Sequence, residues 1–565
     1  MNPLRHARVA NLARRSREVL LLSALTGALT GLAVAGFEWM AGQQGLDRLY
    51  TLPVPVQVAA PAVGLLLAAF ALHWLTDDHN PSTSDEYIRN FHDPSHPLDL
   101  RPVLGRMVAS VATLGSGGAL GFEGPSIYVG AAIGTGLQAR FRRLFALTDV
   151  KVLMVAGAAA GVSAIFKTPA TGAIFAMEVP FRDDTAKRML LPALVGSVTG
   201  YLVYVAIYGT EPLFPVGGSP PFGTRELAGA ALVGVLAGLG ARGFAWLTAW
   251  AKDLSSTRQP SFRIAGAACT LAALVVASRL LYGESLTLGA GYNVIEWIST
   301  GDRAWWALAV LLVLRTAATT ATVAGGGAGG LFVPLVVGGA LVGALCGTGL
   351  AEPSQTLFPV IGVAAFLGAG YRTPIAAVVF VAESTGRPGF IVPGLIATVV
   401  SQLMMGSSSV SKFQAGARVG HLEHRFELPL STATQTQVLT APSDATVDRL
   451  LTETFVMSRH TTVPIVDQGS YIGIITLDDL RTVDPQERSV TPAAALVHDD
   501  APRASPTWSV EQAVRAMSDA GRDLLPVVDT DGTFIGIVTT TDLLRLDEIL
   551  AATEGDRGGG LGDVS

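Results

Sequence analysis

The sequence predicts an all-α polytopic membrane domain with two inverted repeats of broken helices, followed by a soluble α/β domain. Three observations lead to this fold class. Of the 565 residues, 50% are hydrophobic and only 15% are charged, against roughly 25% charged residues in a soluble protein. Charged residues become frequent only after about residue 425, where β-branched runs alternate with helix-like stretches. Each of these two parts also contains motifs that occur twice.

The composition excludes several classes of protein. An apolar content this high rules out a disordered chain or an ordinary soluble enzyme, and the apolar runs must face lipid or pack in a membrane bundle. We expect no enzyme. The net charge of −6 leaves no broad basic surface, and nucleic acid is not an expected partner. Cys269 and Cys346 both sit in apolar runs, which predicts neither a disulfide framework nor a thiol metal site.

Apolar runs of two lengths alternate in the membrane part, where a full crossing needs about 20 residues. The long runs cover 19–41, 54–76, 190–208, 227–251, 262–282, 303–323 and 331–351. The shorter, glycine-rich runs cover 108–119, 126–138, 151–165, 170–180, 357–368 and 374–382. Short helices are tolerated at membrane depth where protein or a water-filled cavity covers their ends, which indicates a path for a small solute. The alternative is long tilted helices with glycine kinks.

The N-terminal segment is basic. Five arginines lie between residues 5 and 17, which places this end of the chain in the cytoplasm. The apolar run that follows leads into further spans and lacks a signal-peptide cleavage site, so we expect it to be retained. We therefore expect a cytoplasmic N-terminus over 1–18 and a membrane domain over 19–425.

Two motifs occur twice, in the same order, within the membrane part. Gly115–Pro125 matches Ala324–Pro334 at five glycine, alanine and proline positions. Farther along, each half has a basic-Thr-Pro sequence with a glutamate nine residues after the proline. We therefore expect two homologous halves, over about 54–208 and 227–405, as in inverted-repeat transporters.

Each glycine-rich motif ends in a proline that leads into an apolar helix. Glycine lets the backbone approach a ligand closely, and proline suits a first helical turn. The free N–H groups of a helix start carry partial positive charge and attract an anion. We expect two such starts, one from each half, to converge on a small anion near the mid-plane. The alternative is close helix packing through small residues.

Glu123 lies inside the first glycine-rich turn. An ionisable side chain at membrane depth is costly and usually functional. Ionised, its carboxylate would occupy an anion position and block the path; protonated or turned away, it would open the path. The sequence therefore predicts that Glu123 gates an anion conduit, the alternative being an exposed loop glutamate at the headgroup level.

Residues 121–125, Gly-Phe-Glu-Gly-Pro, and 330–334, Gly-Leu-Phe-Val-Pro, resemble the G(K/R)EGP and GxFxP motifs of the CLC family of chloride channels and chloride/proton antiporters. This resemblance covers almost the whole chain. It implies that Glu123 is the external gating glutamate and that the backbone N–H groups of Leu331 and Phe332 bind the central chloride. The further chloride-binding positions are Gly121, Phe122, Gly124 and Gly330. The resemblance also implies a homodimer, with helices around 190–208 and 389–405 at its interface.

Two hydroxyl ligands of the family pattern, a serine and a tyrosine, have no exact match in this chain. The best match to the GSGIP motif is Pro-Ser-Thr-Ser-Asp at 81–85, which makes Ser82 the candidate serine ligand and Ser84 the second choice. The pore tyrosine is missing from its expected segment, so Ser411 or Phe413 takes its place. Four residues beside the serine motif fit no compact metal-ligand pattern: His79, Asp85, His92 and His96. We expect no metal.

Other departures concern the gate and the proton path. Phe122 replaces the basic residue of the gate motif, which should weaken anion attraction at the entrance. Val179 stands where most antiporters of the family carry their internal proton-transfer glutamate, so that position is lost here. Water could still deliver protons to Glu123 by another route. Glu178 and Glu383 are matched in the two halves, and we expect them to cap helices or pair within the bundle.

The polar part contains a second repeat, which resembles a tandem pair of CBS domains over 432–548. Each copy reads as two strands followed by a helix that Thr or Asp caps. Such pairs often bind adenine nucleotides. The resemblance would place Thr476 and Asp479, or Thr539 and Asp542, near the ribose and phosphate of ATP or another adenine nucleotide, although the same residues can equally cap a helix. The glycine-rich stretch over 549–565 is expected to be a disordered tail.

We therefore expect chloride transport through the lipid bilayer of the cell (inner) membrane, with both termini cytoplasmic. Val179 favours channel-like or weakly proton-coupled conduction gated by Glu123, and a chloride/proton antiporter is the alternative. A CBS-regulated divalent-cation transporter is an alternative of another class, but few acidic residues lie in the apolar spans. A membrane-anchored nucleotide sensor is a third, although it would not require two matched broken-helix motifs.

Overall fold

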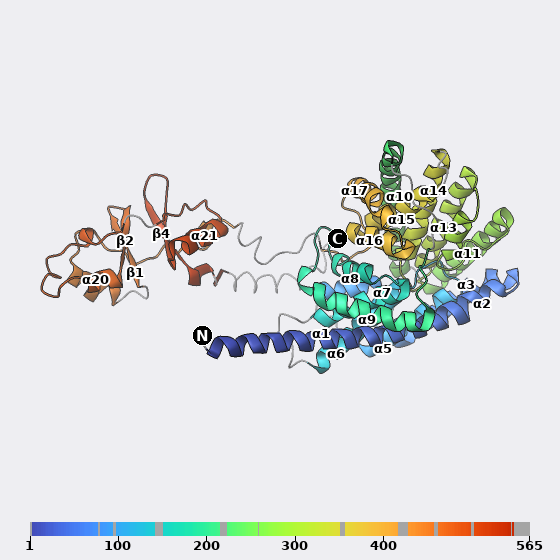
Figure 1. Cartoon of the computed structure of the whole chain (residues 1–565), viewed down its shortest axis with the longest axis horizontal. Coiled ribbons are helices and arrows are strands. Elements are labelled where there is room, and N and C mark those ends of the chain that lie inside the picture. The colour runs from blue at the N-terminus through green and yellow to red at the C-terminus, as the bar shows by residue number, and fades with distance from the viewer. Residues whose placement is uncertain are drawn as a thin grey trace. The chain divides into compact units, whose positions relative to one another are not determined.

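The computed structural model describes residues 3–76, 80–93, 98–141, 151–214, 223–257, 259–350, 356–415, 428–456, 461–498, 502–543 and 545–546. His79, His96 and the predicted tail over 549–565 lie outside these residues. The chain divides into two compact units, Met1–Arg418 and Val419–Ser565. The first is helical, and the second combines short strands with helices (Figure 1).

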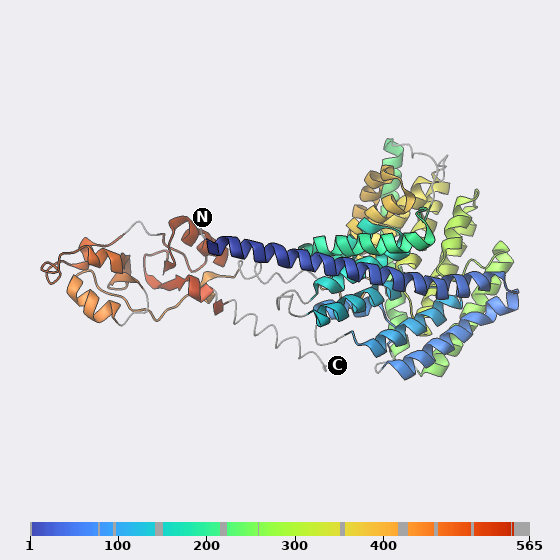
Figure 2. The same cartoon turned by 60° about the horizontal axis from the view of Figure 1, so that its bottom comes forward.

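The membrane unit consists of two successive sets of helices (Figure 2). The first set is α1 (Pro3–Glu38), η1 (Trp39–Asp47), α2 (Arg48–Thr51), α3 (Val54–Leu75), α4 (Ser84–His92), α5 (Leu100–Gly115), α6 (Glu123–Arg140), α7 (Val152–Phe166), α8 (Pro169–Glu178), η4 (Lys187–Met189) and α9 (Leu190–Tyr208). The second set is α10 (Thr224–Thr257), α11 (Pro260–Tyr282), α12 (Tyr292–Ser299), α13 (Trp305–Ala324), α14 (Phe332–Gly349), α15 (Leu357–Tyr371), α16 (Pro374–Thr385), η5 (Pro388–Phe390) and α17 (Ile391–Met405).

Eight of the described helical segments are long and apolar enough to cross a bilayer. Seven correspond to the predicted spans, and the eighth is Pro388–Met405, which the sequence placed at a subunit interface. Several predicted boundaries differ from those of the structure, and two of the differences matter for the argument. The first helix begins at Pro3, so the basic segment before residue 19 continues the same helix. α5 ends at Gly115, before the predicted end at residue 119, because Gly117 takes a φ of 88° and turns the chain.

The two sets pack in the same pattern. α1 packs on α7 and α9 as α10 packs on α15 and α17, while α6 packs on α7 as α14 packs on α15. The backbone also repeats: Gly117 and Gly326 have φ values of 88° and 84°, and Lys167 and Arg372 have 57° and 56°. Because α1 and α10 hold matching positions, the first half extends back to α1, beyond the predicted start at residue 54.

Glycine contacts hold the central helices of each half close together. A Cβ on Gly157 of α7 would fall 1.9 Å from the carbonyl oxygen of Gly130 in α6, and a Cβ on Gly339 of α14 would fall 2.3 Å from that of Gly362 in α15. Only glycine permits these approaches. Close packing, the alternative considered for the glycine-rich runs, therefore accounts for the glycines inside these helices.

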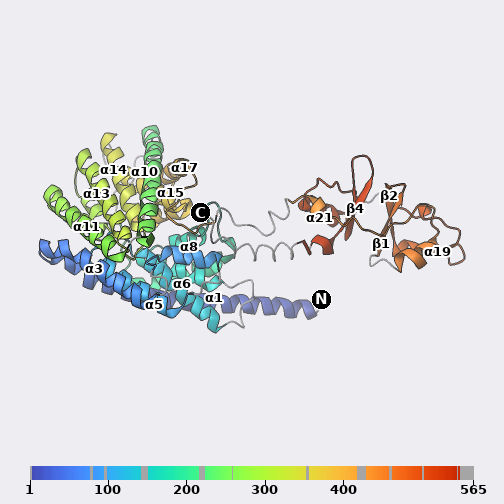
Figure 3. The same cartoon turned by 180° about the vertical axis from the view of Figure 1, so that it is seen from behind.

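The second unit contains two matched hairpins (Figure 3). In the first, β1 (Thr462–Asp467) pairs antiparallel with β2 (Ser470–Thr476), and α20 (Leu477–Arg481) follows; α19 (Val447–Arg449) and η7 (Leu450–Phe455) precede it. In the second, α21 (Val510–Ala520) precedes β3 (Leu524–Val528), which pairs antiparallel with β4 (Phe534–Thr539). Each hairpin changes register near the end of its first strand, which supports the predicted repeat.

Candidate anion-binding site

The two glycine-rich turns meet directly, as the sequence predicts. The Gly121 N–H donates to the Gly330 carbonyl and the Gly330 N–H donates to the Gly121 carbonyl, both at 2.8 Å. The two segments run antiparallel, which is the relation that an inverted repeat produces. One expectation needs correction: in this conformation the Gly121 and Gly330 amides bond to each other, so they offer no free N–H group to an anion.

The carboxylate of Glu123 lies at the start of both broken helices. Glu123 is the first residue of α6 and is completely buried. Its Oε1 accepts a hydrogen bond of 2.6 Å from the Phe332 N–H at the start of α14. A Cβ on Gly121 or Gly330 would fall 1.9 Å from a carboxylate oxygen, so only glycine leaves room for this position. The Glu123 carboxylate therefore accepts the hydrogen bond from the Phe332 N–H group that was expected to bind an anion.

A tyrosine hydroxyl contacts the neighbouring amide, that of Leu331. The Leu331 N–H donates to the hydroxyl oxygen of Tyr371 at 3.3 Å. Tyr371 is the last residue of α15, is buried, and lies edge-on to Phe175 with ring centroids 5.3 Å apart. Both amides expected to bind chloride thus contact protein oxygens. Sequence reasoning missed Tyr371, although the repeat aligns it with Phe166, because each precedes a basic-Thr-Pro sequence.

Of the two serine candidates, Ser84 lies at the site. Its side chain lies beside the Tyr371 hydroxyl, and its buried Oγ makes no hydrogen bond with a described residue. The Ser82 hydroxyl instead donates to Asp85 Oδ2 at 3.2 Å, and that oxygen also accepts from Lys252 Nζ at 2.6 Å. Ser82, the first choice from sequence, therefore helps to hold the loop, and both serines line the cavity that adjoins the helix starts.

A cavity of about 580 Å³ adjoins these groups and is lined by Ser84, Leu331, Tyr371, Ser411 and Phe413 among others. The basic side chains around it are Arg89, Lys252, Arg263 and Lys412. Clustered positive charge raises the local concentration of anions. Arg89, Lys252 and Lys412 form ion pairs with Glu86, Asp85 and Asp253, so Arg263 supplies the excess positive charge of this set among the described residues. This excess makes the cavity an anion-attracting approach to the two helix starts.

The segment expected to carry the pore tyrosine lines the cavity through Ser411 and Phe413 and has a further role through Gln414. Gln414 Nε2 donates to the carbonyl oxygens of Tyr371 and Val179, at 2.7 and 2.8 Å. It therefore holds the backbone at Tyr371 in place. Val179 itself is buried at the end of α8. Phe122, the substituted position of the gate motif, packs on Phe37 with ring centroids 5.8 Å apart.

In the second unit, both Thr–Asp pairs that are candidates for nucleotide binding cap helices or turns. The Thr476 hydroxyl donates to Asp479 Oδ2 at 2.6 Å and accepts from the Asp479 N–H at 3.3 Å. Thr539 and Asp542 make the same two bonds at 2.6 and 3.3 Å. The second aspartate also accepts a bond from Gln435. The capping role is therefore observed for each pair.

Together these features define a membrane protein in which two broken-helix repeats converge on a buried site for a small anion. The family model described as "Voltage gated chloride channel" matches residues 63–406, and the CBS domain model matches 431–485 and 493–548. The chain therefore belongs to the voltage-gated chloride channel family, CLC, and carries tandem CBS domains. This membership argues against a divalent-cation transporter.

Two relatives match most of the membrane domain. The putative chloride channel protein ClcB-like of Ralstonia nicotianae is 25% identical over 431 residues, which are 73% of this chain and 99% of the relative. The H(+)/Cl(−) exchange transporter ClcA of Cronobacter sakazakii is 28% identical over 428 residues, which are 70% and 89%.

Solved structures share the fold. A slow cyanobacterial Cl⁻/H⁺ antiporter has a TM-score of 0.61 and 21% identity, over 68% of this chain and 94% of that chain. A CLC-type fluoride/proton antiporter has a TM-score of 0.60 and 23% identity, over 71% and 98%. A eukaryotic CLC transporter has a TM-score of 0.55 and 15% identity, over 94% and 98%.

Proposed function

We propose that the protein exchanges chloride for protons across the membrane, with Glu123 as the gate. The observation that carries this proposal is the hydrogen bond from the Phe332 N–H to the Glu123 carboxylate. A chloride ion needs the same amide, so it can bind there only when the carboxylate is turned away. Protonation weakens the hold of a backbone amide on a carboxylate, since charge-assisted hydrogen bonds are the stronger ones. Anion movement and proton uptake are thereby linked at one residue.

The chloride pathway would use only neutral donors at its centre. Two backbone N–H groups, of Leu331 and Phe332, and two hydroxyl groups, of Ser84 and Tyr371, face the same region. Tyr371 joins Ser411 as a proposed ligand. Tyr371 contacts the Leu331 amide, and Ser411 lines the adjoining cavity with a buried Oγ that makes no hydrogen bond with a described residue. The helix starts add partial positive charge without a buried cation.

Exchange is better supported than channel-like conduction, to which sequence reasoning gave preference. The Cronobacter relative, and the relatives from Salmonella at 25–26% identity, are named H(+)/Cl(−) exchange transporters. Val179 favours a channel-like alternative, since valine cannot carry a proton. In an exchanger, protons would then reach Glu123 through water.

We also propose a homodimer in the cell (inner) membrane, with the N- and C-termini in the cytoplasm. The apolar outer faces of α9 and α17 support the dimer. Leu191 and Leu202 are 57% and 55% exposed, and Val399 and Leu403 are 58% and 72% exposed. The basic segment at the start of α1 supports the cytoplasmic placement.

The reversal potential of the reconstituted protein tests the exchange proposal. Opposed chloride and proton gradients should displace it from the chloride equilibrium potential. A value at the chloride equilibrium potential, at every proton gradient, would identify a channel instead. A Glu123→Gln variant measured in parallel should lose the displacement, because an amide cannot carry the proton.

We further propose that the CBS pair binds ATP or another adenine nucleotide at Thr476 and Asp479. The Asp542 carboxylate is more enclosed, because it also accepts from Gln435, whereas that of Asp479 has the half-exposed His498 as its neighbour at 3.0 Å. ATP at millimolar concentration should raise the unfolding midpoint of the full-length protein. Asp479→Asn should remove the shift, and an unshifted wild-type midpoint would favour a purely structural CBS pair.

A further inference from the structure

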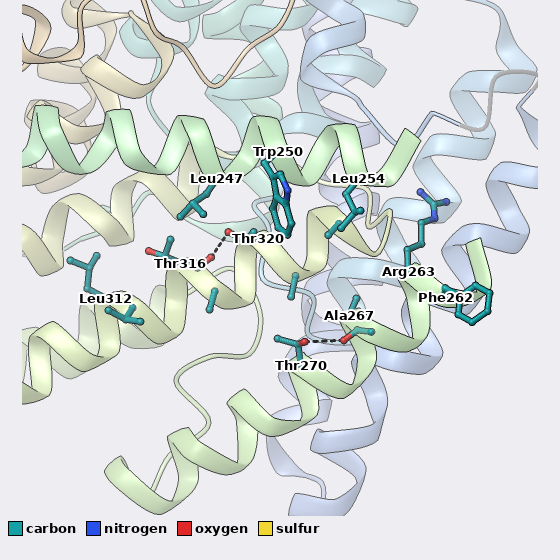
Figure 4. A pocket seen from close by; sticks show the side chains of 15 residues that line it. Leu247, Trp250, Leu254, Phe262, Arg263, Ala267, Thr270, Leu312, Thr316 and Thr320 are labelled. Carbon is teal, nitrogen blue, oxygen red and sulfur yellow. Dashed lines mark hydrogen bonds between the residues drawn. The ribbon is translucent and has the colours of Figure 1, made fainter. Parts of the chain in front are cut away.

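An apolar groove runs between three helices of the second half (Figure 4). α10 and α11 each pack along α13 and touch each other only slightly, so α13 forms the floor and the other two helices form the walls. The groove has a volume of about 790 Å³, within the roughly 300–1,000 Å³ of typical ligand pockets. It therefore offers space to a sizeable ligand.

The groove surface is apolar even where threonines line it. The Thr270 hydroxyl donates to the Gly266 carbonyl at 2.9 Å, and the Thr320 hydroxyl donates to the Thr316 carbonyl at 2.8 Å (Figure 4). Because these hydroxyl hydrogens are bonded within their own helices, they do not require a hydrogen-bond acceptor on the ligand. The groove therefore suits hydrocarbon.

The groove opens toward the bilayer. All three of its helices are long and apolar enough to cross a membrane. Large side chains on its rim are exposed, with Trp250 at 52%, Phe262 at 75% and Val313 at 67%. In a membrane the molecules that reach such a surface are lipids, so the occupant is a lipid acyl chain.

One end of the groove carries a positive charge. Arg263 is the one charged residue among those that line the groove, and it lies at the end opposite Leu312 (Figure 4). α10 ends at Thr257 and α11 begins at Pro260, so this end lies where the chain reverses, at a membrane surface. Phe262 lies beside Arg263 at this end, and Leu254 lies between Arg263 and Trp250 (Figure 4).

The Arg263 guanidinium has donors to spare. One of its Nη atoms donates to the Ser255 carbonyl, while its Nε makes no hydrogen bond with a described residue. No acidic side chain among the described residues forms an ion pair with it. Lys252 and Lys412, which line the anion-attracting cavity together with Arg263, pair with Asp85 and Asp253 at 2.6 Å. Within the described part of the chain, Arg263 is thus a cation that lacks an anionic partner.

The matching groove of the first half provides an internal comparison. It lies between α3 and α5, has a volume of about 670 Å³, and is lined by residues that include Phe70, Trp74 and Val108 but no charged side chain. Both grooves can receive hydrocarbon. In the first half, Arg101 donates to the backbone carbonyl of Trp74 at 2.9 Å without lining the groove, whereas Arg263 itself lines the groove of the second half. This lining cation selects for an anionic headgroup.

We propose that the groove between α10, α11 and α13 binds an anionic phospholipid, with an acyl chain along α13 and the phosphate on Arg263. Arg263 also borders the anion-attracting cavity, where its guanidinium lies against Gly326 of the second glycine-rich turn. A bound phosphate therefore neutralises one of the charges that draw anions toward the site. Membrane lipid composition is thereby connected to anion uptake.

Native mass spectrometry of the full-length protein tests this site, with phosphatidylglycerol and phosphatidylcholine of identical acyl chains as probes. The wild type should retain phosphatidylglycerol about fivefold better, since one basic residue near a membrane surface contributes on the order of a fivefold preference for anionic lipid. Arg263→Gln should abolish this preference. Arg242→Gln, which changes an exposed arginine of α10 outside the groove, should preserve it.

A second variant tests the apolar part of the site. A Cβ added at Gly266, which lines the groove, would meet no atom within 4 Å. Gly266→Leu should therefore fold normally and fill part of the groove. It should lower the retention of both lipids. Equal retention of the two lipids by the wild type, an unchanged preference in Arg263→Gln, or unchanged retention in Gly266→Leu would each overturn the proposal.

Discussion

Glu178 and Glu383 each cap the first turn of the other's helix. The Glu178 carboxylate, at the end of α8, accepts the N–H groups of Ile375 and Ala376 at 3.2 and 2.9 Å. The Glu383 carboxylate, in α16, accepts the N–H groups of Ala170 and Thr171 at 2.8 and 2.7 Å, and the Thr171 hydroxyl at 2.7 Å. This exchange confirms the expected capping role and joins the two halves where α8 and α16 meet.

Replacing either glutamate by alanine should destabilise the membrane domain. Each substitution leaves N–H groups without an acceptor at a helix start, which costs about 1–3 kcal/mol. Glu383→Ala should have the larger effect, because its carboxylate accepts three bonds and that of Glu178 accepts two. Thermal unfolding in detergent, followed by size-exclusion chromatography, measures the difference.

An exposed capping glutamate provides the control. Glu226 accepts the Gly223 N–H at 2.9 Å on the surface, and Glu226→Ala should shift the midpoint far less. Equal shifts in all three variants would contradict the reciprocal cap as a source of stability.

Glu123→Gln should raise chloride flux and make it independent of pH. A neutral amide holds the Phe332 N–H less strongly than a carboxylate does, and it does not titrate. Chloride efflux from liposomes, measured over a range of pH, reports both effects. Glu296→Gln, an exposed change in α12, should behave as the wild type does. A flux of wild-type size with a wild-type pH response would count against the gate.

Tyr371→Phe should weaken chloride binding about fivefold. The substitution keeps the ring against Phe175 and removes only the hydroxyl that meets the Leu331 N–H, a change worth about 1 kcal/mol. Calorimetric titration of chloride gives the affinity. Tyr87→Phe is the matched control, since that hydroxyl donates to the Ala176 carbonyl at 2.7 Å outside the proposed path. Equal affinities in the wild type and Tyr371→Phe would remove Tyr371 from the site.

The stability that Asp479 contributes should be lost in acid. Partial burial raises the pKa of its carboxyl, but hydrogen bonds from Thr476 and the ring of His498 outweigh that effect and hold the pKa below its ordinary value. A depressed pKa stabilises the fold above the unfolded pKa, and that stability is lost as pH falls through the folded pKa. The gap in unfolding midpoint between the wild type and Asp479→Asn should thus shrink as the pH falls below about 4. A gap that stays the same size in acid would contradict the depressed pKa.

The sequence predicts the features that depend on local pattern. Hydrophobic run length predicts the spans, and the paired glycine motifs predict that the turns around Gly121 and Gly330 converge. The same reasoning places Glu123 at a helix start beside the second turn.

The features that it misses depend on three-dimensional contacts between distant segments. Tyr371 reaches the Leu331 amide because α15 ends beside the start of α14. The family pattern places the pore tyrosine near residue 411, so it does not predict this contact. The contacts of Ser82 likewise depend on a distant residue. Its hydroxyl donates to Asp85, which also accepts a hydrogen bond from Lys252.

The pair of hydrogen bonds between Gly121 and Gly330 has a consequence for the transport cycle. These bonds join the two halves beside the Glu123 carboxylate, so a rigid rocking of one half against the other would have to break both bonds. We therefore expect the cycle to proceed through small rotations of side chains such as Glu123, within a scaffold that stays nearly still.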